Sequence, residues 1–449
     1  MNEHITDSER YPTLSARGYA MLQQLREHPA APVYRNQSGN RLRADEVAQQ
    51  HAYEATVLHA PVGWPRGTQP DWLHDFVART FKTVPYFRAL GSPAIRFEDL
   101  PTTSRANLSQ DIAAFVPDDV SLERMMNFRT SGTTGHPLLI PSHPVVAGRY
   151  LAFHRRALQR VGIDLQHGAG QVGVVLLGYQ RKCFTYVSVN PTLHDSGLAK
   201  INLHPNDWQH PDDRANYLNA MAPEIYAGDP VSFSELLCLQ ISVKPRALIS
   251  VSMTLSTALK SALSEKFSCP VLDVYSMNEA GPIACYEDAF QGHVLLQPQL
   301  YVEILDRHGQ VVEEGERGEI VLTGGFNFCL PLIRYRTGDF ASLQWTGTVP
   351  VLGNLSGRQP VRYRIASGAW INNIDITHAL SILPIPQYGV HQLADGSMTL
   401  KLPLAASVYS KAAIQILQDL FQGDRILLET INPDDKMMQY TSDLEGALL

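Results

Sequence analysis

The sequence predicts an α/β fold: a large N-terminal α/β core with a β-rich subdomain, followed by a small ferredoxin-like α+β domain at the C-terminus. Apolar strands predicted at residues 172–177, 247–251 and 271–275 alternate with helical segments, which is typical of parallel sheets. From residue 300 short strands around turns replace this pattern. After residue 357 the predicted elements follow the order β-α-β-β-α-β, which is the ferredoxin-like arrangement.

Length and composition limit the kind of protein. A chain of 449 residues exceeds one ordinary domain, and a hydrophobic fraction of 44% supports a sizeable core. The net charge of −7 argues against a nucleic-acid surface, which would be basic. The five cysteines form no C-x-x-C pair, which indicates reduced thiols in a cytoplasmic protein. Signal-peptide patterns and long apolar runs are absent, so we expect no membrane partner.

The elements before the core are predicted to be helical. Helices near residues 16–27 and 44–55 fit either a decorating arm or the surface of a homodimer. Apolar residues recur at helical spacing from residue 72 to 87, and Thr103 or Ser104 can cap the helix that follows Pro101. We predict three domains, namely a helical arm at 1–70, a core at 71–356 and a mobile lid at 357–449.

A loop of hydroxyl groups and glycines lies inside the core. Glycine lets backbone N–H groups approach an anion closely, and Ser and Thr hydroxyls add further donors. The spacing is not that of a Walker loop, and a Gly/Thr surface turn is the alternative. An apolar run at 138–140 follows, so we place the loop between two strands. The anion-binding candidates are Thr130, Ser131, Gly132, Thr133, Thr134 and Gly135.

Four stretches together resemble the adenylate-forming (acyl-CoA synthetase-like) superfamily, and most closely the phenylacetate–CoA ligase family. Residues 131–137 resemble that family's Ser-Gly-Thr-Thr-Gly-Lys-Pro loop, with His136 in place of lysine. Residues 275–281 are similar to its Tyr-Gly-x-Thr-Glu-x-Gly, and residues 334–339 match its Arg-Tyr-Arg-Thr-Gly-Asp. The pair Gly357-Arg358 resembles the hinge before its C-terminal lid.

The resemblance implies an enzyme that uses ATP and Mg²⁺ to activate a small carboxylic acid as an acyl-adenylate, releasing pyrophosphate. The acyl group would then pass to a thiol, most simply that of CoA. Besides the loop, the implied nucleotide-binding residues are Tyr275 at the adenine, Asn278 at a phosphate, Asp339 at the ribose hydroxyls, and Arg358. The implied catalytic residues are Glu279 as the Mg²⁺ ligand, Lys436 in the lid, and Arg358.

Each of these residues also has a structural interpretation. Tyr275 fits a buried core tyrosine, Glu279 a surface glutamate and Asp339 a turn residue. Lys436 fits a solvated lysine in an acidic turn, since Asp435 stands where the family has glycine. For Arg336 we favour a structural ion pair over a phosphate contact.

The resemblance also places the acid substrate. The residues expected to border it are Tyr179, Phe184, Tyr186, Asp229 and Ser252. His194, His204 and His210 lie near acidic residues, but their spacing fits no zinc motif, and we favour loop histidines.

Departures from the family pattern leave alternatives open. They are His136, Pro360 after the hinge arginine, and Val251-Ser252-Met253 in place of Ser-Gly-Glu. They affect thioester formation more than adenylation. One alternative is therefore an adenylating enzyme that loads a carrier protein or an amine, and another is a nucleotide-binding relative without catalysis.

Overall fold

A computed structural model of the chain describes residues 5–93, 96–129, 138–179, 183–356, 361–385, 387–423, 425–431 and 438–447. The described residues form two compact units. The first unit comprises the described parts of Met1–Thr13, Asn40–Asp164 and Val274–Arg358. The second comprises those of Leu14–Gly39, Leu165–Asp273 and Gln359–Leu449. The domain boundaries predicted at residues 70 and 356 stay predictions.

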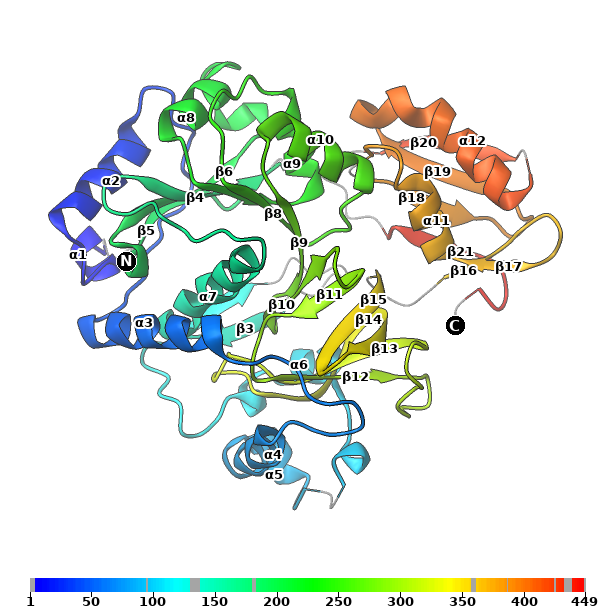
Figure 1. The fold of residues 1–449 in the computed structure, drawn as a ribbon, viewed down its shortest axis with the longest axis horizontal. Coiled ribbons are helices and arrows are strands. Elements are labelled where there is room, and N and C mark those ends of the chain that lie inside the picture. The colour runs from blue at the N-terminus through cyan, green and yellow to red at the C-terminus, as the bar shows by residue number, and fades with distance from the viewer. Residues whose placement is uncertain are drawn as a thin grey trace. The chain divides into compact units, whose positions relative to one another are not determined.

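The helices predicted near residues 44–55 and 72–87 are present in the first unit. The segment predicted at residues 72–87 is two helices, because Pro85 cannot supply the N–H that would continue the first. Figure 1 shows α3 running beside α7, and Arg155 of α7 forms an ion pair with Glu54 of α3 at 2.6 Å. The helices are α1 (Asp7–Arg10), α3 (Ala44–His59), α4 (Trp72–Thr83), α5 (Pro85–Ala89), α6 (Arg105–Gln110) and α7 (Pro144–Arg160).

The strands of the first unit form an antiparallel sheet and a separate hairpin. Their order in the sheet is β12-β13-β14-β15-β11-β10-β9, and the short β1 pairs in parallel with β14. The hairpin of β2 and β3 flanks the predicted anion loop, as expected. The strands are β1 (Thr103–Ser104), β2 (Met126–Arg129), β3 (Leu139–Ser142), β9 (Val271–Met277), β10 (Gly281–Glu287), β11 (Gly292–Leu295), β12 (Leu300–Leu305), β13 (Arg317–Gly324), β14 (Leu332–Thr346) and β15 (Val349–Ser356).

The second unit contains the parallel α/β part that the sequence predicted. Strands β6, β4, β7 and β8 are parallel neighbours in that order, and β5 closes the edge in antiparallel orientation. Figure 1 shows α8, α9 and α10 beside this sheet. The elements are α2 (Ala16–Glu27), β4 (Val172–Gly178), β5 (Tyr186–Asn190), β6 (Ser196–Asn202), α8 (Asp213–Met221), β7 (Ile225–Gly228), α9 (Pro230–Cys238), β8 (Ala247–Val251) and α10 (Thr257–Phe267).

The C-terminal part of the second unit has a hydrophobic core of its own, in which Ile376, Leu400 and Leu417 are fully buried. Its sheet has the order β20-β19-β18-β21, and the first predicted strand lies outside it, in a hairpin with β17. The predicted mixed α/β class with a small C-terminal subdomain is confirmed, but this strand order differs from the ferredoxin-like one. The elements are β16 (Arg362–Arg364), β17 (Trp370–Asn372), α11 (Asn373–Leu380), β18 (Gly389–Gln392), β19 (Met398–Pro403), α12 (Ser410–Phe421), β20 (Ile426–Ile431) and β21 (Tyr440–Ser442).

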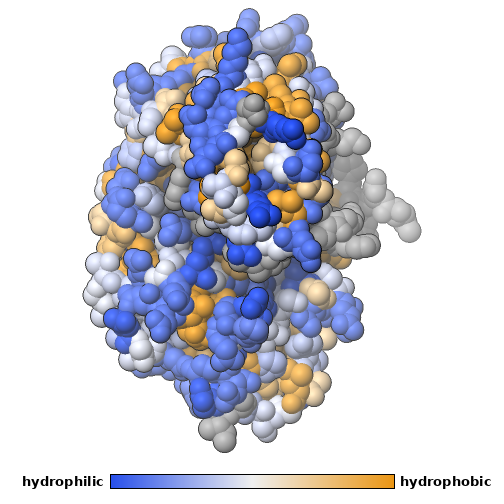
Figure 2. Space-filling view, turned by 90° about the vertical axis from the view of Figure 1, so that its right-hand side faces the viewer, coloured by the Kyte–Doolittle hydropathy of each residue, from blue (hydrophilic) through white to orange (hydrophobic). Residues whose placement is uncertain are grey.

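Hydrophilic residues cover most of the face drawn in Figure 2, and hydrophobic residues gather there in small separate groups. Scattered apolar groups of this kind are ordinary on a protein surface. In the part of the chain that the structure describes, no helix combines the length and the apolar character needed to cross a bilayer.

Candidate active site

Glu279 lies in the short connection between β9 and β10 and is 5% exposed. Its Oε1 atom accepts a hydrogen bond from Nη1 of Arg105 at 3.1 Å and one from the hydroxyl of Tyr335 at 3.3 Å. Both of these hydrogen bonds end on the same carboxylate oxygen. The surface interpretation of Glu279 is therefore wrong, because this carboxylate is buried and held by two donors.

Asp339 lies within β14, at a point where the pairing with β13 changes register. Gly338, in this irregular stretch, has a φ of +76°, a backbone conformation that glycine adopts without steric cost. The hydroxyl of Tyr275 donates to Oδ2 of Asp339 at 2.7 Å. Burial, with a contribution from Asp339, raises the pKa of Tyr275 well above its usual value, so this phenol remains a donor.

The two tyrosine–carboxylate hydrogen bonds join residues 275–279 to residues 335–339 reciprocally. Tyr275 precedes Glu279 by four residues, and Tyr335 precedes Asp339 by four. Each tyrosine donates to the acidic residue of the other segment. The structure thus brings together the two carboxylates that the sequence singled out for metal and ribose binding.

Arg334 and Arg336 of β14 form ion pairs with glutamates of β12 and β13. Arg336 forms an ion pair with Glu319 on β13, which supports the structural role that the sequence favoured. Arg334 is 3% exposed, contacts Glu303 at 3.1 Å, and donates to the carbonyls of Glu98 and Leu100. It thereby ties the segment before β1 to β14.

Arg105 is a site residue that the sequence reasoning missed. Thr103 or Ser104 was predicted to cap the helix that follows, and Ser104 is indeed the N-cap residue of α6. Arg105 reaches Glu279 because β1 pairs with β14, with Thr103 opposite Tyr335. The contact between residues 105 and 279 cannot be predicted from a local sequence pattern, because 174 positions separate them.

In the second unit, the carboxyl ends of the parallel strands lie in one row. Gly178 pairs with Asn202, Leu177 with Gly228, and Gly228 with Ser250. Ligands of open α/β sheets bind at such an edge. The predicted acid-site residues that directly follow these strands are Tyr179 after β4, Asp229 after β7 and Ser252 after β8.

The same residues have local roles as well. Asp229 is the N-cap of α9, where its Oδ1 accepts from the backbone N–H of Ser232 at 2.8 Å. Burial raises the pKa of Asp229 in spite of this bond. The Tyr179 ring lies 5.5 Å from that of His204, and the Phe184 ring lies 5.6 Å from that of Tyr186.

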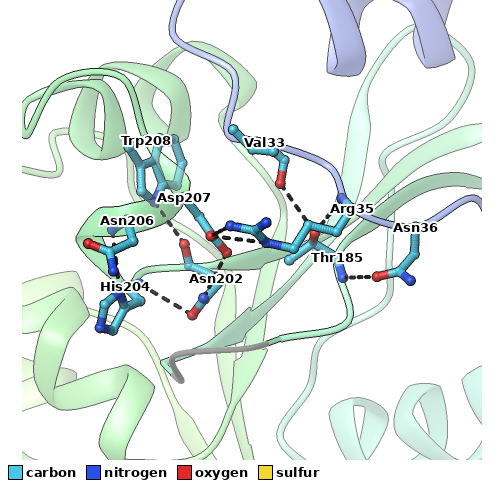
Figure 3. A network of polar contacts seen from close by, with 9 residues as sticks. All are labelled: Val33, Arg35, Asn36, Thr185, Asn202, His204, Asn206, Asp207 and Trp208. Atoms are coloured by element: carbon cyan, nitrogen blue, oxygen red, sulfur yellow. Dashed lines mark hydrogen bonds and ion pairs between the residues drawn. The ribbon is translucent and has the colours of Figure 1, made fainter.

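Residues 33–36 of the N-terminal segment contact Thr185 and Asp207 in this unit (Figure 3). The sequence did not predict these contacts. Arg35 forms an ion pair with Asp207, a carboxylate with no exposed surface, and Asn202 donates to the other oxygen of Asp207 at 2.8 Å. The backbone N–H of Arg35 donates to Oγ1 of Thr185 at 3.0 Å, and Oδ1 of Asn36 accepts from the Thr185 N–H at 3.1 Å. Thr185 stands between Phe184 and Tyr186, so the N-terminal segment is hydrogen-bonded to the residue between two predicted acid-site residues.

Metal sites built from protein side chains alone are absent from the described ranges, which hold no cluster of three or more His, Cys, Asp or Glu side chains suited to a metal. His204 instead accepts, through Nδ1, from the backbone N–H of Asn206 at 3.3 Å. His194 has a left-handed backbone with a φ of +54° after β5.

Several predicted site residues lie outside the described residues. They are the anion-loop residues Thr130, Ser131, Gly132, Thr133, Thr134 and Gly135, the hinge residue Arg358, and the lid residue Lys436. Their roles stay predictions. Asn278 is described and is exposed beside Glu279.

The chain is similar in sequence and in fold to several known proteins. The family of AMP-binding enzymes matches residues 179–328. A phenylacetate-coenzyme A ligase from Aromatoleum evansii is 34% identical over 90 residues, which are 19% of this chain and 20% of that protein. The one from Escherichia coli K12 is 31% identical over 90 residues, 19% and 21% of the two chains. These alignments thus span about a fifth of the length of the relatives.

A solved 2-hydroxyisobutyryl-CoA ligase in the postadenylation state, in complex with R3-HIB-AMP, matches with a TM-score of 0.60. It is 17% identical, and the match covers 90% of each chain. The same ligase in complex with 2-HIB-AMP matches with a TM-score of 0.56 at 18% identity, over 95% of this chain and 88% of the other. The chain therefore has the fold of this solved 2-hydroxyisobutyryl-CoA ligase, is similar over about a fifth of its length to phenylacetate-coenzyme A ligases, and matches the AMP-binding enzyme family over residues 179–328.

Proposed function

We propose that the chain activates a carboxylic acid with ATP and transfers the acyl group to a thiol, that of CoA. In the first step a carboxylate oxygen of the acid attacks the α-phosphorus of ATP. The bond between the α-phosphorus and the bridging oxygen to the β-phosphate breaks, and pyrophosphate leaves. In the second step the thiol sulfur attacks the acyl carbon, AMP leaves, and the thiol proton is released.

The observation that carries the proposal is a reciprocal pair of hydrogen bonds between residues 275–279 and residues 335–339. Tyr275 donates to Asp339, and Tyr335 donates to Glu279. This arrangement holds the two carboxylates in defined orientations before any ligand binds. A preorganised pair of carboxylates suits a nucleotide whose ribose offers two hydroxyl groups and whose phosphates carry a divalent cation.

Magnesium fits the donor set of Glu279. Mg²⁺ in nucleotide sites takes one or two carboxylates, and phosphate oxygens and waters complete its shell, so it needs no cluster of protein ligands. Both described hydrogen bonds to Glu279 end on Oε1, which leaves Oε2 for a cation. A bound Mg²⁺ would neutralise charge on the phosphates during the displacement.

The remaining roles rest on the sequence alone. The loop from Thr130 to Gly135 would hold phosphate oxygens, Lys436 would meet the α-phosphate during adenylation, and Arg358 would act at the hinge. The acid would lie at the carboxyl edge of the parallel strands, where Tyr179, Asp229 and Ser252 follow β4, β7 and β8.

Acid-dependent exchange of radioactive pyrophosphate into ATP tests the proposal. A panel of aryl, aliphatic and amino acids should contain members that promote exchange. Glu279→Gln should abolish this exchange, and Asp339→Ala should reduce it at subsaturating ATP. A folded protein that binds ATP but exchanges with no acid in the panel would favour the non-catalytic alternative. Release of AMP in the presence of CoA, compared with a carrier protein or an amine, then identifies the acceptor.

A further inference from the structure

We propose that Arg105 is the positioning residue for the magnesium carboxylate. Together with the hydroxyl of Tyr335 it holds Oε1 of Glu279, so that Oε2 is directed to the cation on the ATP phosphates. This inference rests on the proposed function and deepens it, because it assigns a role to a residue outside the expected nucleotide and acid sites.

Glu279 needs a partner of opposite charge. The residue is 5% exposed, and a carboxylate that has lost most of its water is costly to keep ionised without a charged donor. The Arg105 side chain forms the ion pair at 3.1 Å and is itself 34% exposed. It can therefore compensate the charge of Glu279 while its own guanidinium group retains contact with solvent.

The backbone places Arg105 independently of any ligand. Thr103 pairs with Tyr335 and Ser104 with Arg336, so the strand that leads into Arg105 lies in fixed register beside the strand that carries Tyr335. Oγ1 of Thr103 donates to the carbonyl of Ile333 at 2.9 Å, which adds a side-chain bond to this short pairing. Arg105 follows as the first residue of α6.

This geometry favours a positioning role over competition with the cation. A guanidinium group that competed with Mg²⁺ would have to leave Glu279 when the metal binds. Here Arg105 shares Oε1 with a neutral hydroxyl group, and neither described bond engages Oε2. The negative triphosphate offsets repulsion between Arg105 and a cation on the other oxygen. Partners that orient a metal-binding carboxylate typically contribute 10- to 100-fold in metal affinity.

The test is calorimetric titration of the full chain with ATP, once in excess Mg²⁺ and once in EDTA. The dissociation constant of ATP in EDTA divided by that in excess Mg²⁺ measures how much Mg²⁺ strengthens binding. Arg105→Ala should reduce this ratio by about tenfold or more, and it should change the constant in EDTA by less than about twofold. Arg105→Lys, which keeps the charge, should restore part of the ratio. Tyr335→Phe should reduce it less than Arg105→Ala, because it removes a neutral donor.

The matched control is Arg88→Ala, which breaks the exposed ion pair between Arg88 and Asp118 at 2.6 Å in the same unit and should leave both constants unchanged. Thermal melting reports whether each variant folds, and Arg105→Gln replaces Arg105→Ala if the latter does not. Equal weakening with and without Mg²⁺ would mean that Arg105 contacts phosphate directly, and a larger ratio would make it a competitor of the metal. Either result overturns the inference alone, whereas a wild-type protein without Mg²⁺-dependent ATP binding overturns the proposed function.

Discussion

The hydroxyl group of Tyr275 donates a hydrogen bond to Oδ2 of Asp339 at 2.7 Å, from a side chain that packs against the core of the first unit. The sequence left Tyr275 between two interpretations, adenine stacking and a buried core residue. The hydrogen bond gives it a further role, because a phenol with a raised pKa keeps its proton and orients the carboxylate that would receive the ribose.

Tyr275→Phe should therefore weaken ATP binding by about 1 kcal/mol, or roughly fivefold, since one net hydrogen bond is lost while the ring remains. Asp339→Ala should cost more, about 1.5–3 kcal/mol, which is the range for hydrogen bonds to a charged group. Because the pKa of Tyr275 is raised, the ratio of wild-type to Tyr275→Phe affinity should stay constant between about pH 6 and pH 9. Calorimetry at several pH values measures both effects.

Tyr301→Phe is the control for this experiment. It removes a phenol from β12 of the same sheet, where the ring packs on Trp64 and Phe97, and it should leave ATP affinity unchanged. Equal affinities for wild type and Tyr275→Phe, with both proteins folded, would return Tyr275 to a purely structural role.

Glu224 should make stability depend on pH in the acidic range. Its side chain has no exposed surface, and it accepts from the backbone N–H of His167 and from Nη1 of Arg246, each at 2.8 Å. Burial acts to raise its pKa, but these bonds outweigh burial and lower the pKa below the usual 4.5. The stabilisation is thus complete above the unfolded-state pKa and is lost as the pH falls through the folded-state pKa.

The free energy of unfolding, measured by urea titration, should decline as the pH falls below about 4.5. Glu224→Gln should lower stability at neutral pH by about 1.5–3 kcal/mol and flatten this decline. Glu235→Gln on α9, which breaks a more exposed ion pair with Arg214, should leave the acid profile intact. Superimposable pH profiles for wild type and Glu224→Gln would contradict the assignment.

The predicted hinge gives a third test. The C-terminal part has a hydrophobic core of its own, in which Leu400, Leu417 and Tyr363 are fully buried, and such a part resists proteolysis as a body. Limited proteolysis should cut between residues 353 and 360, and ATP should change the rate of cutting. A chain that is degraded without a stable fragment, or one whose cutting ATP leaves unchanged, would count against a mobile lid.

Elements with strong local signals could be predicted from the sequence. A helix was predicted near residues 16–27, and it is present at Ala16–Glu27, where apolar residues recur at helical spacing and Ser15 is the N-cap. The parallel strands at 172–177 and 247–251 were found because apolar residues predominate in each without alternating with polar ones. The three-residue strand Tyr440–Ser442 was missed, because so short a segment shows no periodicity, and its presence changes the order of the C-terminal sheet.

The site divides in the same way. Glu279 and Asp339 belong to recognisable motifs, so the sequence singled them out as candidates. Arg105 and Arg35 were not found, because their partners lie 174 and 172 residues away in the sequence. Contacts of this kind depend on strand pairing and on the path of the N-terminal segment. Neither can be predicted from the spacing of residue types within a short stretch of sequence.

Substitution of Lys436 tests most directly whether the chain catalyses adenylation as proposed. An ammonium group at the α-phosphate would stabilise charge that develops as the acid attacks, whereas transfer from an adenylate that already exists needs no such contact. Removal of one preorganised donor of this type typically costs about 10²–10³ in rate. Lys436→Ala should therefore lose pyrophosphate exchange by about this factor, and it should still consume a supplied acyl-adenylate at close to the wild-type rate.

Two assays on the same preparation separate the interpretations of Lys436. Equal losses in exchange and in adenylate consumption would indicate a role in folding, which thermal melting would detect independently. No loss in either assay would leave Lys436 a surface lysine, as its acidic neighbours Asp434 and Asp435 would allow. Lys411→Ala on α12 is the control, because it removes a lysine from the same C-terminal part and should affect neither half-reaction. Only a loss confined to exchange identifies Lys436 as the group that acts on the developing charge.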